Sequence, residues 1–206
     1  GDYYDTLRID EDRVAIVISD VSGKGTSAAF HMSQMKGIFQ SLAQIELNTK
    51  DFLVKANTAL SKCLDKTSFI TTSYFIIDAK SKSVEFARAG HCPTLYYNSA
   101  AKKWDFFQNK GLGLGILRNG DFSNFINPES FQYKSNDIIV LYTDGITEAK
   151  NPKNDEYGYE RLQEVVTSMI DASVDEITGA IIDDLYGFTG SPIIDDDYTT
   201  LVIKFK

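Results

Sequence analysis

The order of strand-like and helix-like segments limits the possible folds of this chain more than any other feature of its sequence. Short runs rich in β-branched and aromatic residues predict strands at residues 13–19, 69–78, 83–89, 94–97, 104–107, 137–143 and 198–205. Apolar residues three or four positions apart predict two pairs of helices, at residues 26–42, 51–64, 159–170 and 174–186. Short strands in close succession pair as hairpins, so we expect an α+β fold in which antiparallel sheets lie between helical layers.

The first two predicted helices each carry an apolar stripe. We expect the buried residues to be Ala28, Met32, Met35, Phe39 and Leu42 in one helix and Phe52, Ala56, Leu60 and Cys63 in the other. Thr26 or Ser27 is expected to cap the first helix, because a hydroxyl there can accept a hydrogen bond from an unpaired backbone N–H. Methionine and aromatic stripes of this kind are typical of a core and not of a cofactor pocket.

Size and charge predict a globular domain with an acidic surface. With 206 residues, of which 43% are hydrophobic, the chain can bury a substantial core, and we expect residues 1–206 to form a single domain. The net charge of −8 argues against nucleic acid or an anionic membrane as the main partner, because both require a basic face.

The cysteine content and the hydropathy pattern indicate in which cellular compartment the protein is expected. Cys63 and Cys92 are too few for a disulfide framework, which fits a reducing cytoplasm, and each is expected to be a small buried hydrophobe. The sequence contains neither an apolar run of about 20 residues nor a signal peptide. We therefore expect a soluble cytoplasmic protein.

Four short acidic segments carry the strongest chemical signal. They are residues 1–5, 20–25, 143–149 and 195–199, and three of them adjoin an apolar strand-like run. A fold that aligns these strand ends gathers several carboxylates at one point, which is costly unless cations lie among them. Carboxylate oxygens are hard ligands, so the segments predict a divalent-metal site that favours Mg²⁺ or Mn²⁺.

Two glycine-rich segments imitate nucleotide-binding motifs without matching them. Residues 22–27 follow a strand and precede a helix, but a P-loop needs glycine at position 18 and Ser or Thr at position 25, where the chain has Ile18 and Gly25. Residues 111–115 lack both a following helix and the third glycine of a dinucleotide loop, so they are interpreted as a flexible loop.

The chain has two histidines, His31 and His91, and neither has zinc-ligand spacing to another His or Cys. His31 lies within a predicted helix, where a structural role is expected. His91 lies at a predicted hairpin corner, where it either shapes the loop or borders the site. No Ser-His-Asp triad can be placed, and Gly-x-Ser-x-Gly is absent.

Five segments taken together resemble the metal-dependent protein phosphatases of the PP2C (PPM) family, and above all the bacterial branch typified by SpoIIE and RsbU. These segments are residues 1–5, 20–25, 89–93, 141–149 and 195–199. The resemblance implies an α-β-β-α sandwich, in which two antiparallel sheets flanked by helices carry a two-metal site at one end. Because the sequence begins at Gly1 without a methionine, we also expect a C-terminal fragment of a longer protein with an N-terminal sensor or regulatory domain.

The same resemblance assigns ligands for two Mn²⁺ or Mg²⁺ ions. It implies that Asp20 bridges both ions and that Asp144 and Asp196 hold one of them. Asp2 and the Val21 carbonyl are implied for the other. Asp20, Asp144 and Asp196 are accordingly the expected catalytic residues.

The run of three aspartates near the C-terminus leaves the register open. The family pattern Asp-Asp-x-Thr is matched by residues 196–199, so Asp196 is chosen as the ligand and Asp197 as its neighbour. Asp195 and Asp5 are expected to be local turn or hydrogen-bonding residues.

The implied activity is hydrolysis of phosphoserine or phosphothreonine by a metal-activated water, without a nucleophilic side chain. The expected partner is a phosphorylated protein, by resemblance a STAS-domain antagonist of an anti-sigma factor. Many eukaryotic relatives have a histidine where this chain has Ser22, so the general acid is unassigned, and Lys24 is either a phosphate contact or an exposed turn cation. The alternatives are a catalytically inactive phosphoprotein-binding domain of the same fold and a hydrolase of small phosphate esters.

Overall fold

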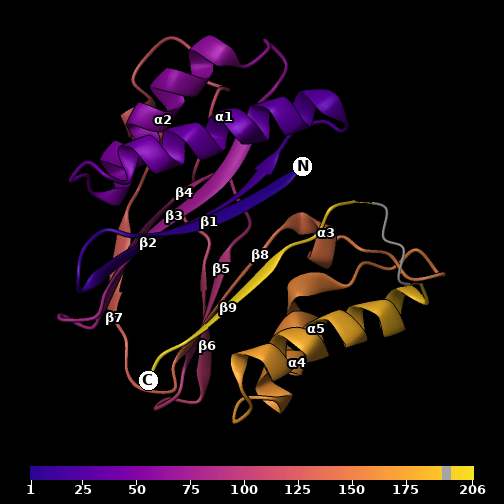
Figure 1. Cartoon of the computed structure of the whole chain (residues 1–206). Coiled ribbons are helices and arrows are strands. Elements are labelled where there is room, and N and C mark those ends of the chain that lie inside the picture. Colours follow the sequence, from indigo (N-terminus) through magenta and orange to yellow (C-terminus); the bar gives the residue numbers. More distant parts are fainter. Residues whose placement is uncertain (192–195) are drawn as a thin grey trace. The chain divides into compact units, whose positions relative to one another are not determined.

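The computed structural model describes residues 1–191 and 196–206, which fold into two compact units (Figure 1). The first unit contains Gly1–His91 and Asn109–Tyr133, and the second contains Cys92–Gln108 and Lys134–Lys206. Each unit has one antiparallel sheet and one pair of long helices. Both units are therefore assembled from segments that are distant in the sequence.

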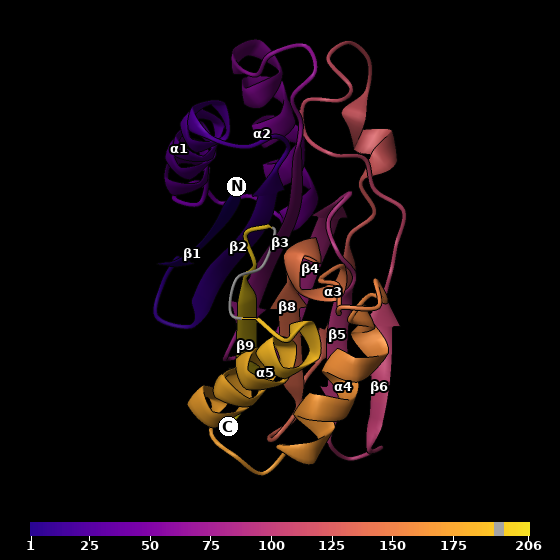
Figure 2. The same ribbon diagram turned by 90° about the vertical axis from the view of Figure 1, so that its right-hand side faces the viewer.

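The sheet of the first unit has five strands in the order β1-β2-β3-β4-β7. They are β1 (Asp2–Arg8), β2 (Arg13–Val21), β3 (Ile70–Asp78), β4 (Ser83–Ala89) and β7 (Glu129–Gln132). Helices α1 (Thr26–Leu42) and α2 (Thr49–Cys63) lie side by side over one face of this sheet (Figures 1 and 2). The unit also has a short 3₁₀ helix, η1 (Phe122–Phe125).

Aromatic rings join the helix pair to the sheet of the first unit. Phe52 of α2 stacks on Tyr74 of β3 with ring centroids 3.7 Å apart, and Phe39 of α1 meets both rings edge-on. All three side chains are buried. Burial of a side chain of this size contributes about 1.5–3 kcal/mol, so this cluster anchors α1 and α2 on the sheet.

The glycine-rich segment is a loop, as predicted, and it is fastened to α2. The Asn57 side chain accepts a hydrogen bond from Gly115 N (2.8 Å) and donates one to the Leu117 carbonyl (3.1 Å). Arg118 donates to carbonyls at the C-terminal end of α2, at 2.9 and 3.0 Å. These bonds tie residues 111–118 to the helix pair.

The second unit has a four-stranded sheet in the order β6-β5-β8-β9. Its elements are β5 (Thr94–Asn98), β6 (Lys103–Phe107), β8 (Ile138–Tyr142), β9 (Thr200–Lys204), the single-turn helix α3 (Asp144–Thr147), α4 (Gly158–Ser168) and α5 (Val174–Thr189). The apolar sides of α4 and α5 share a core with the sheet. A capping box between Ser173 and Glu176 starts α5, and Gly190 in the left-handed conformation ends it.

The predicted fold class is confirmed: the protein contains two antiparallel sheets flanked by helices. Every predicted strand and helix is present, with ends shifted by a few residues. The strands β1 and β7 and the helix α3 were not predicted. Among the described residues, no helix combines the length and apolar character needed to cross a bilayer.

Two details of the helix pair differ from the predictions. The N-cap of α1 is Gly25, at φ 75°, and no side chain caps the helix, so the expected capping by Thr26 or Ser27 is wrong. Cys63 is exposed and Cys92 only partly buried, which corrects the expectation that both are buried. Cys63 is the last residue of α2, and the buried apolar position at this end is taken by Leu64 instead.

Candidate metal centre

The β1–β2 pairing brings two predicted ligands face to face. Asp2 lies directly opposite Asp20 in the antiparallel ladder. The preceding residues of β2 are buried from Ala15 to Ser19, whereas the Asp20 side chain is 27% exposed, so the strand delivers this carboxylate to its accessible end. Like charges directly opposite one another destabilise a sheet unless a cation lies between them.

The β1–β2 ladder continues past Asp20. Gly1 N donates a hydrogen bond to the Val21 carbonyl (3.2 Å), and Val21 N donates one to the Gly1 carbonyl (3.1 Å). A carbonyl oxygen has two lone pairs, so Val21 can accept this bond and still face a metal ion. The oxygen donors of Asp2, Asp20 and Val21 fit Mg²⁺ or Mn²⁺.

The second unit brings the other two acidic segments together. Asp144 is the first residue of α3, directly after β8 and Thr143. Thr143 N donates to the Thr199 carbonyl (3.1 Å), and Thr199 N donates to Thr143 Oγ1 (2.9 Å). These bonds hold the chain that follows Asp196 against the turn that carries Asp144.

Gly145 permits the close approach of these two segments. A Cβ atom added at Gly145 would lie 1.9 Å from the Asp197 carbonyl oxygen, a distance at which the backbone would have to move. Asp196 is exposed, and its Oδ1 accepts a hydrogen bond from Asp197 N (3.0 Å). The absence of a side chain at position 145 thus helps to set the path of the Asp196–Asp197 segment.

The predicted ligands therefore form two pairs, one in each unit. Asp2 and Asp20 belong to the first unit with Val21, while Asp144 and Asp196 belong to the second. Among the described residues, no group of three or more His, Cys, Asp or Glu side chains is arranged to hold a metal ion. Asp195 lies outside the described residues.

The structure also shows the surroundings of Asp5 and Lys24, which the sequence analysis singled out. Asp5 accepts hydrogen bonds from Gln40 Nε2 (2.7 Å) and the Tyr3 hydroxyl (3.0 Å), as expected for a local hydrogen-bonding residue. Lys24 is exposed in the turn between β2 and α1.

Ser22 exchanges hydrogen bonds with the start of β3. Its Oγ accepts a hydrogen bond from Phe69 N (2.8 Å), and its own N–H donates to the Phe69 carbonyl (3.0 Å). Ser22 therefore fixes the turn that follows Asp20.

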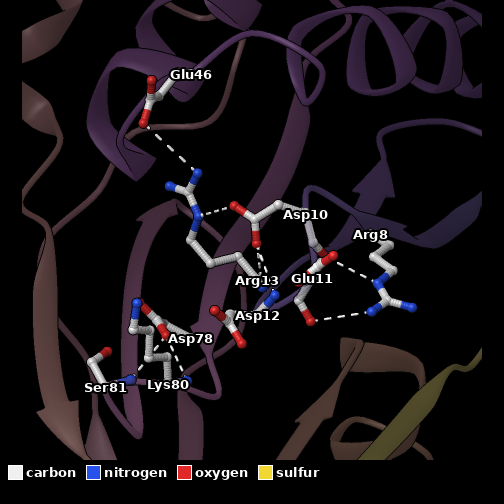
Figure 3. Close-up of polar contacts among 9 residues, drawn as sticks. All are labelled: Arg8, Asp10, Glu11, Asp12, Arg13, Glu46, Asp78, Lys80 and Ser81. Atoms are coloured by element: carbon white, nitrogen blue, oxygen red, sulfur yellow. Dashed lines mark hydrogen bonds and ion pairs between the residues drawn. The ribbon is translucent and has the colours of Figure 1, made fainter.

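A second acidic cluster lies at the turn of the same hairpin (Figure 3). The Asp10 carboxylate accepts hydrogen bonds from the Arg13 guanidinium (2.7 Å) and from the backbone N–H groups of Asp12 and Arg13. The Arg13 guanidinium holds the pKa of Asp10 below its usual value. Backbone N–H groups in the neighbouring turn lower the pKa of Asp78 in the same way. These carboxylates stabilise turns.

Comparison with solved structures identifies the fold. The PP2C phosphatase domain of the cell fate determinant SpoIIE from Bacillus subtilis, solved with a fragment of its regulatory domain, matches with a TM-score of 0.79 at 23% identity, over 99% of this chain and 58% of that one. RsbX in complex with magnesium matches with a TM-score of 0.67 at 15% identity, over 98% of this chain and 85% of that one. The fold is that of a PP2C phosphatase domain, as the resemblance implied.

The sequence comparison narrows this class to a family. The sequence model described as Stage II sporulation protein E (SpoIIE) matches residues 10–206, and the chain belongs to this family. Phosphoserine phosphatase RsbU of Bacillus subtilis (strain 168) is 31% identical, over 100% of this chain and 59% of RsbU. The chain thus spans less than two thirds of RsbU and of the SpoIIE structure. The predicted membership of the SpoIIE branch of the PP2C family is confirmed by these relatives.

Proposed function

We propose that residues 1–206 form one metal-dependent protein serine/threonine phosphatase domain, which hydrolyses phosphoserine or phosphothreonine. The observation that carries the proposal is the direct pairing of Asp2 with Asp20, next to the Val21 carbonyl. Such a pair of carboxylates on rigid strands is costly for a binding module and useful to an enzyme that holds cations.

The proposed site contains two Mn²⁺ or Mg²⁺ ions. As the resemblance implies, Asp20 would serve both ions, Asp144 and Asp196 would hold one of them, and Asp2 with the Val21 carbonyl would hold the other. When bound, the ions supply a nucleophilic water at neutral pH and neutralise charge that develops on the phosphate ester. The magnesium bound to RsbX supports a divalent ion in this fold.

The protein's own contribution is to hold its carboxylates in place before substrate arrives. Asp2 and Asp20 lie on paired strands, and Ser22 pins the turn after Asp20 to Phe69. On the other unit, the Thr143–Thr199 bonds and Gly145 set the positions of Asp144 and the Asp196 segment. Ligands fixed in this way need little rearrangement during reaction.

The proposed substrate is a phosphorylated protein, specifically a STAS-domain antagonist of an anti-sigma factor. The support is the relationship to RsbU, which is named as a phosphoserine phosphatase. The chain covers 59% of RsbU, and the matching SpoIIE structure includes part of a regulatory domain. We therefore propose that this domain works within a longer regulatory protein in the cytoplasm.

The test is release of phosphate from a phosphoserine-containing STAS-domain protein, with Mn²⁺ or with a chelator. Asp20→Asn should abolish the Mn²⁺-dependent turnover, because it removes the shared ligand. Asp10→Asn is the matched control, since it makes the same change at the other end of the β1–β2 hairpin and should retain activity. Circular dichroism should show that both variants are folded.

Three results would contradict this function. Turnover that is unaffected by the chelator or by Asp20→Asn would exclude the proposed metal site. A folded protein that binds Mn²⁺ and the phosphoprotein without hydrolysis would instead identify an inactive binding domain. Faster hydrolysis of nucleotides than of phosphoserine peptides would identify a small-ester hydrolase.

A further inference from the structure

A chain of polar contacts links His91 to the backbone of Asp20 within the first unit. Thr71 lies directly opposite Asp20 in the β2–β3 ladder. Its hydroxyl lies 3.5 Å from the Asp20 carbonyl, to which it donates, and 2.9 Å from His91 Nδ1. His91 follows β4 and is 4% exposed. These contacts therefore join the loop after β4 to the end of β2 through a side chain of β3.

The tautomer of His91 decides the direction of these hydrogen bonds. A threonine hydroxyl has one proton to donate. If His91 Nδ1 carries a proton, it donates to Thr71 Oγ1 and the hydroxyl proton is available to the Asp20 carbonyl; in the other tautomer the hydroxyl donates to Nδ1. The Nδ1-protonated tautomer is therefore the one that links His91 to the Asp20 carbonyl.

The backbone around His91 is itself held in place. Arg88 donates to the His91 carbonyl and to the Asn109 carbonyl (2.7 Å). Gly90 forms a bridge with Thr72, the neighbour of Thr71, and has a φ of 72°. A Cβ at Gly90 would lie 2.9 Å from Gly113 N, so the corner before His91 requires glycine. His91 is consequently a rigid support for the Thr71 hydroxyl.

We propose that His91, acting through Thr71, is a positioning residue for the divalent cation site, because it sets the orientation of the peptide between Asp20 and Val21. The inference rests on the proposed function, which assigns the Asp20 carboxylate and the Val21 carbonyl as ligands on either side of that peptide. A tilt of this peptide moves both ligands together. Loss of a partner that orients a metal ligand typically weakens metal affinity by about 10–100-fold.

Thr71→Val is the direct test, because it removes the hydroxyl and keeps the shape of the side chain. We expect the dissociation constant for Mn²⁺, measured by titration calorimetry in the absence of substrate, to rise about tenfold or more. Thr71→Ser keeps the hydroxyl and should bind Mn²⁺ within about threefold of the wild-type protein.

Thr72→Val is the matched control for general destabilisation. Thr72 Oγ1 bonds the Ser19 hydroxyl (3.0 Å), is buried, and lies one residue away on the same strand. Thr72→Val should lower the melting temperature as Thr71→Val does, without weakening Mn²⁺ binding more than about twofold. His91→Asn, whose amide nitrogen can replace Nδ1, should bind Mn²⁺ more tightly than His91→Ala.

The outcomes separate this inference from the proposed function. If Asp20→Asn weakens Mn²⁺ binding but Thr71→Val does not, the positioning role of His91 and Thr71 is wrong and the metal site stands. If Thr72→Val weakens binding as much as Thr71→Val, the link is merely structural and the inference is again wrong. If Asp20→Asn itself leaves Mn²⁺ binding unchanged, the metal site fails and this inference fails with it.

Discussion

The two ends of the β1–β2 hairpin carry the same kind of side chain in opposite surroundings. At the turn, Asp10 is surrounded by donors: the Arg13 guanidinium and two backbone N–H groups. At the open end, the residue directly opposite Asp20 is another aspartate, Asp2. Donors therefore hold the carboxylate at the turn, whereas two carboxylates face each other at the open end. It is this facing pair on which the proposed cation site depends.

Asp20→Asn, at the open end of the β1–β2 hairpin, should have the largest effect. We expect the Mn²⁺-dependent phosphatase activity to fall at least about 1,000-fold, because the proposed metal site loses one of its ligands. In the metal-free protein the melting temperature should rise or stay unchanged, because the repulsion between Asp2 and Asp20 is removed. Phosphate release and differential scanning calorimetry with chelator measure the two effects. A clear fall in melting temperature would show that Asp20 stabilises the apoprotein, contrary to the comparison.

Gly145→Ala extends the comparison to the second unit. The added Cβ would collide with the Asp197 carbonyl and displace the segment that carries Asp196. We expect about a 100-fold loss of activity, which is typical when a group at the site moves by about 1 Å. Kinetics at several Mn²⁺ concentrations measure this loss. Gly179→Ala is the control, since its Cβ would meet no atom within 4 Å on α5. Equal activity of the two variants would contradict the role of Gly145.

Asp10→Asn tests the other end of the hairpin. Activity should stay within about twofold of wild type, while the melting temperature at neutral pH should fall because the charge-assisted bond to Arg13 is weakened. The pKa of Asp10 is lowered in the folded protein, so its stabilisation is complete above the ordinary carboxyl pKa of about 4. It is lost as the pH falls through the lowered pKa.

The difference in melting temperature between wild type and Asp10→Asn should accordingly vanish in acid. Calorimetry across this pH range provides the measurement. A difference that persists at the lowest pH at which both proteins fold would mean that the charge of Asp10 is not the cause.

Ser22→Ala should have the smallest effect. It removes the acceptor for Phe69 N but leaves the Ser22 N–H bond to the Phe69 carbonyl in place. A neutral hydrogen bond of this kind contributes about 1 kcal/mol, so we expect less than a tenfold loss of activity. Steady-state kinetics on the phosphoprotein would detect a larger loss, which would indicate that Ser22 takes part in the reaction itself.

Elements with a strong apolar pattern could be predicted from the sequence. The buried run of β2 and the apolar faces of α2 and α5 are local signals, and each produced the predicted element. β1 was missed because Tyr3 is its one buried residue, so its sequence lacks an apolar alternation. β7 and α3 have four residues each, too few for a periodic pattern. Weak local signals of this kind become strands or turns through pairing with distant segments.

Cys63 shows the limit of helical periodicity. Its spacing from Phe52, Ala56 and Leu60 places it on the apolar face of α2, but the helix ends at this residue and its side chain is exposed. The N-cap of α1 was also predicted incorrectly. Gly25 adopts a positive φ that the turn requires, and this conformation replaces capping by the hydroxyls that follow.

The amino-acid sequence specifies which groups this protein has available: the acidic segments at strand ends, the glycines beside them and the order of strands and helices. Which of these groups meet depends on how the strands and helices pack. Strand pairing places Asp2 of β1 and Thr71 of β3 opposite Asp20 of β2. Tertiary packing also places His91 next to Thr71, and Gly145 next to the Asp197 carbonyl. The physical reason is that strand register depends on matching buried faces across distant segments, and a shift of one residue would turn Asp2, Asp20 or Thr71 to the other face of the sheet.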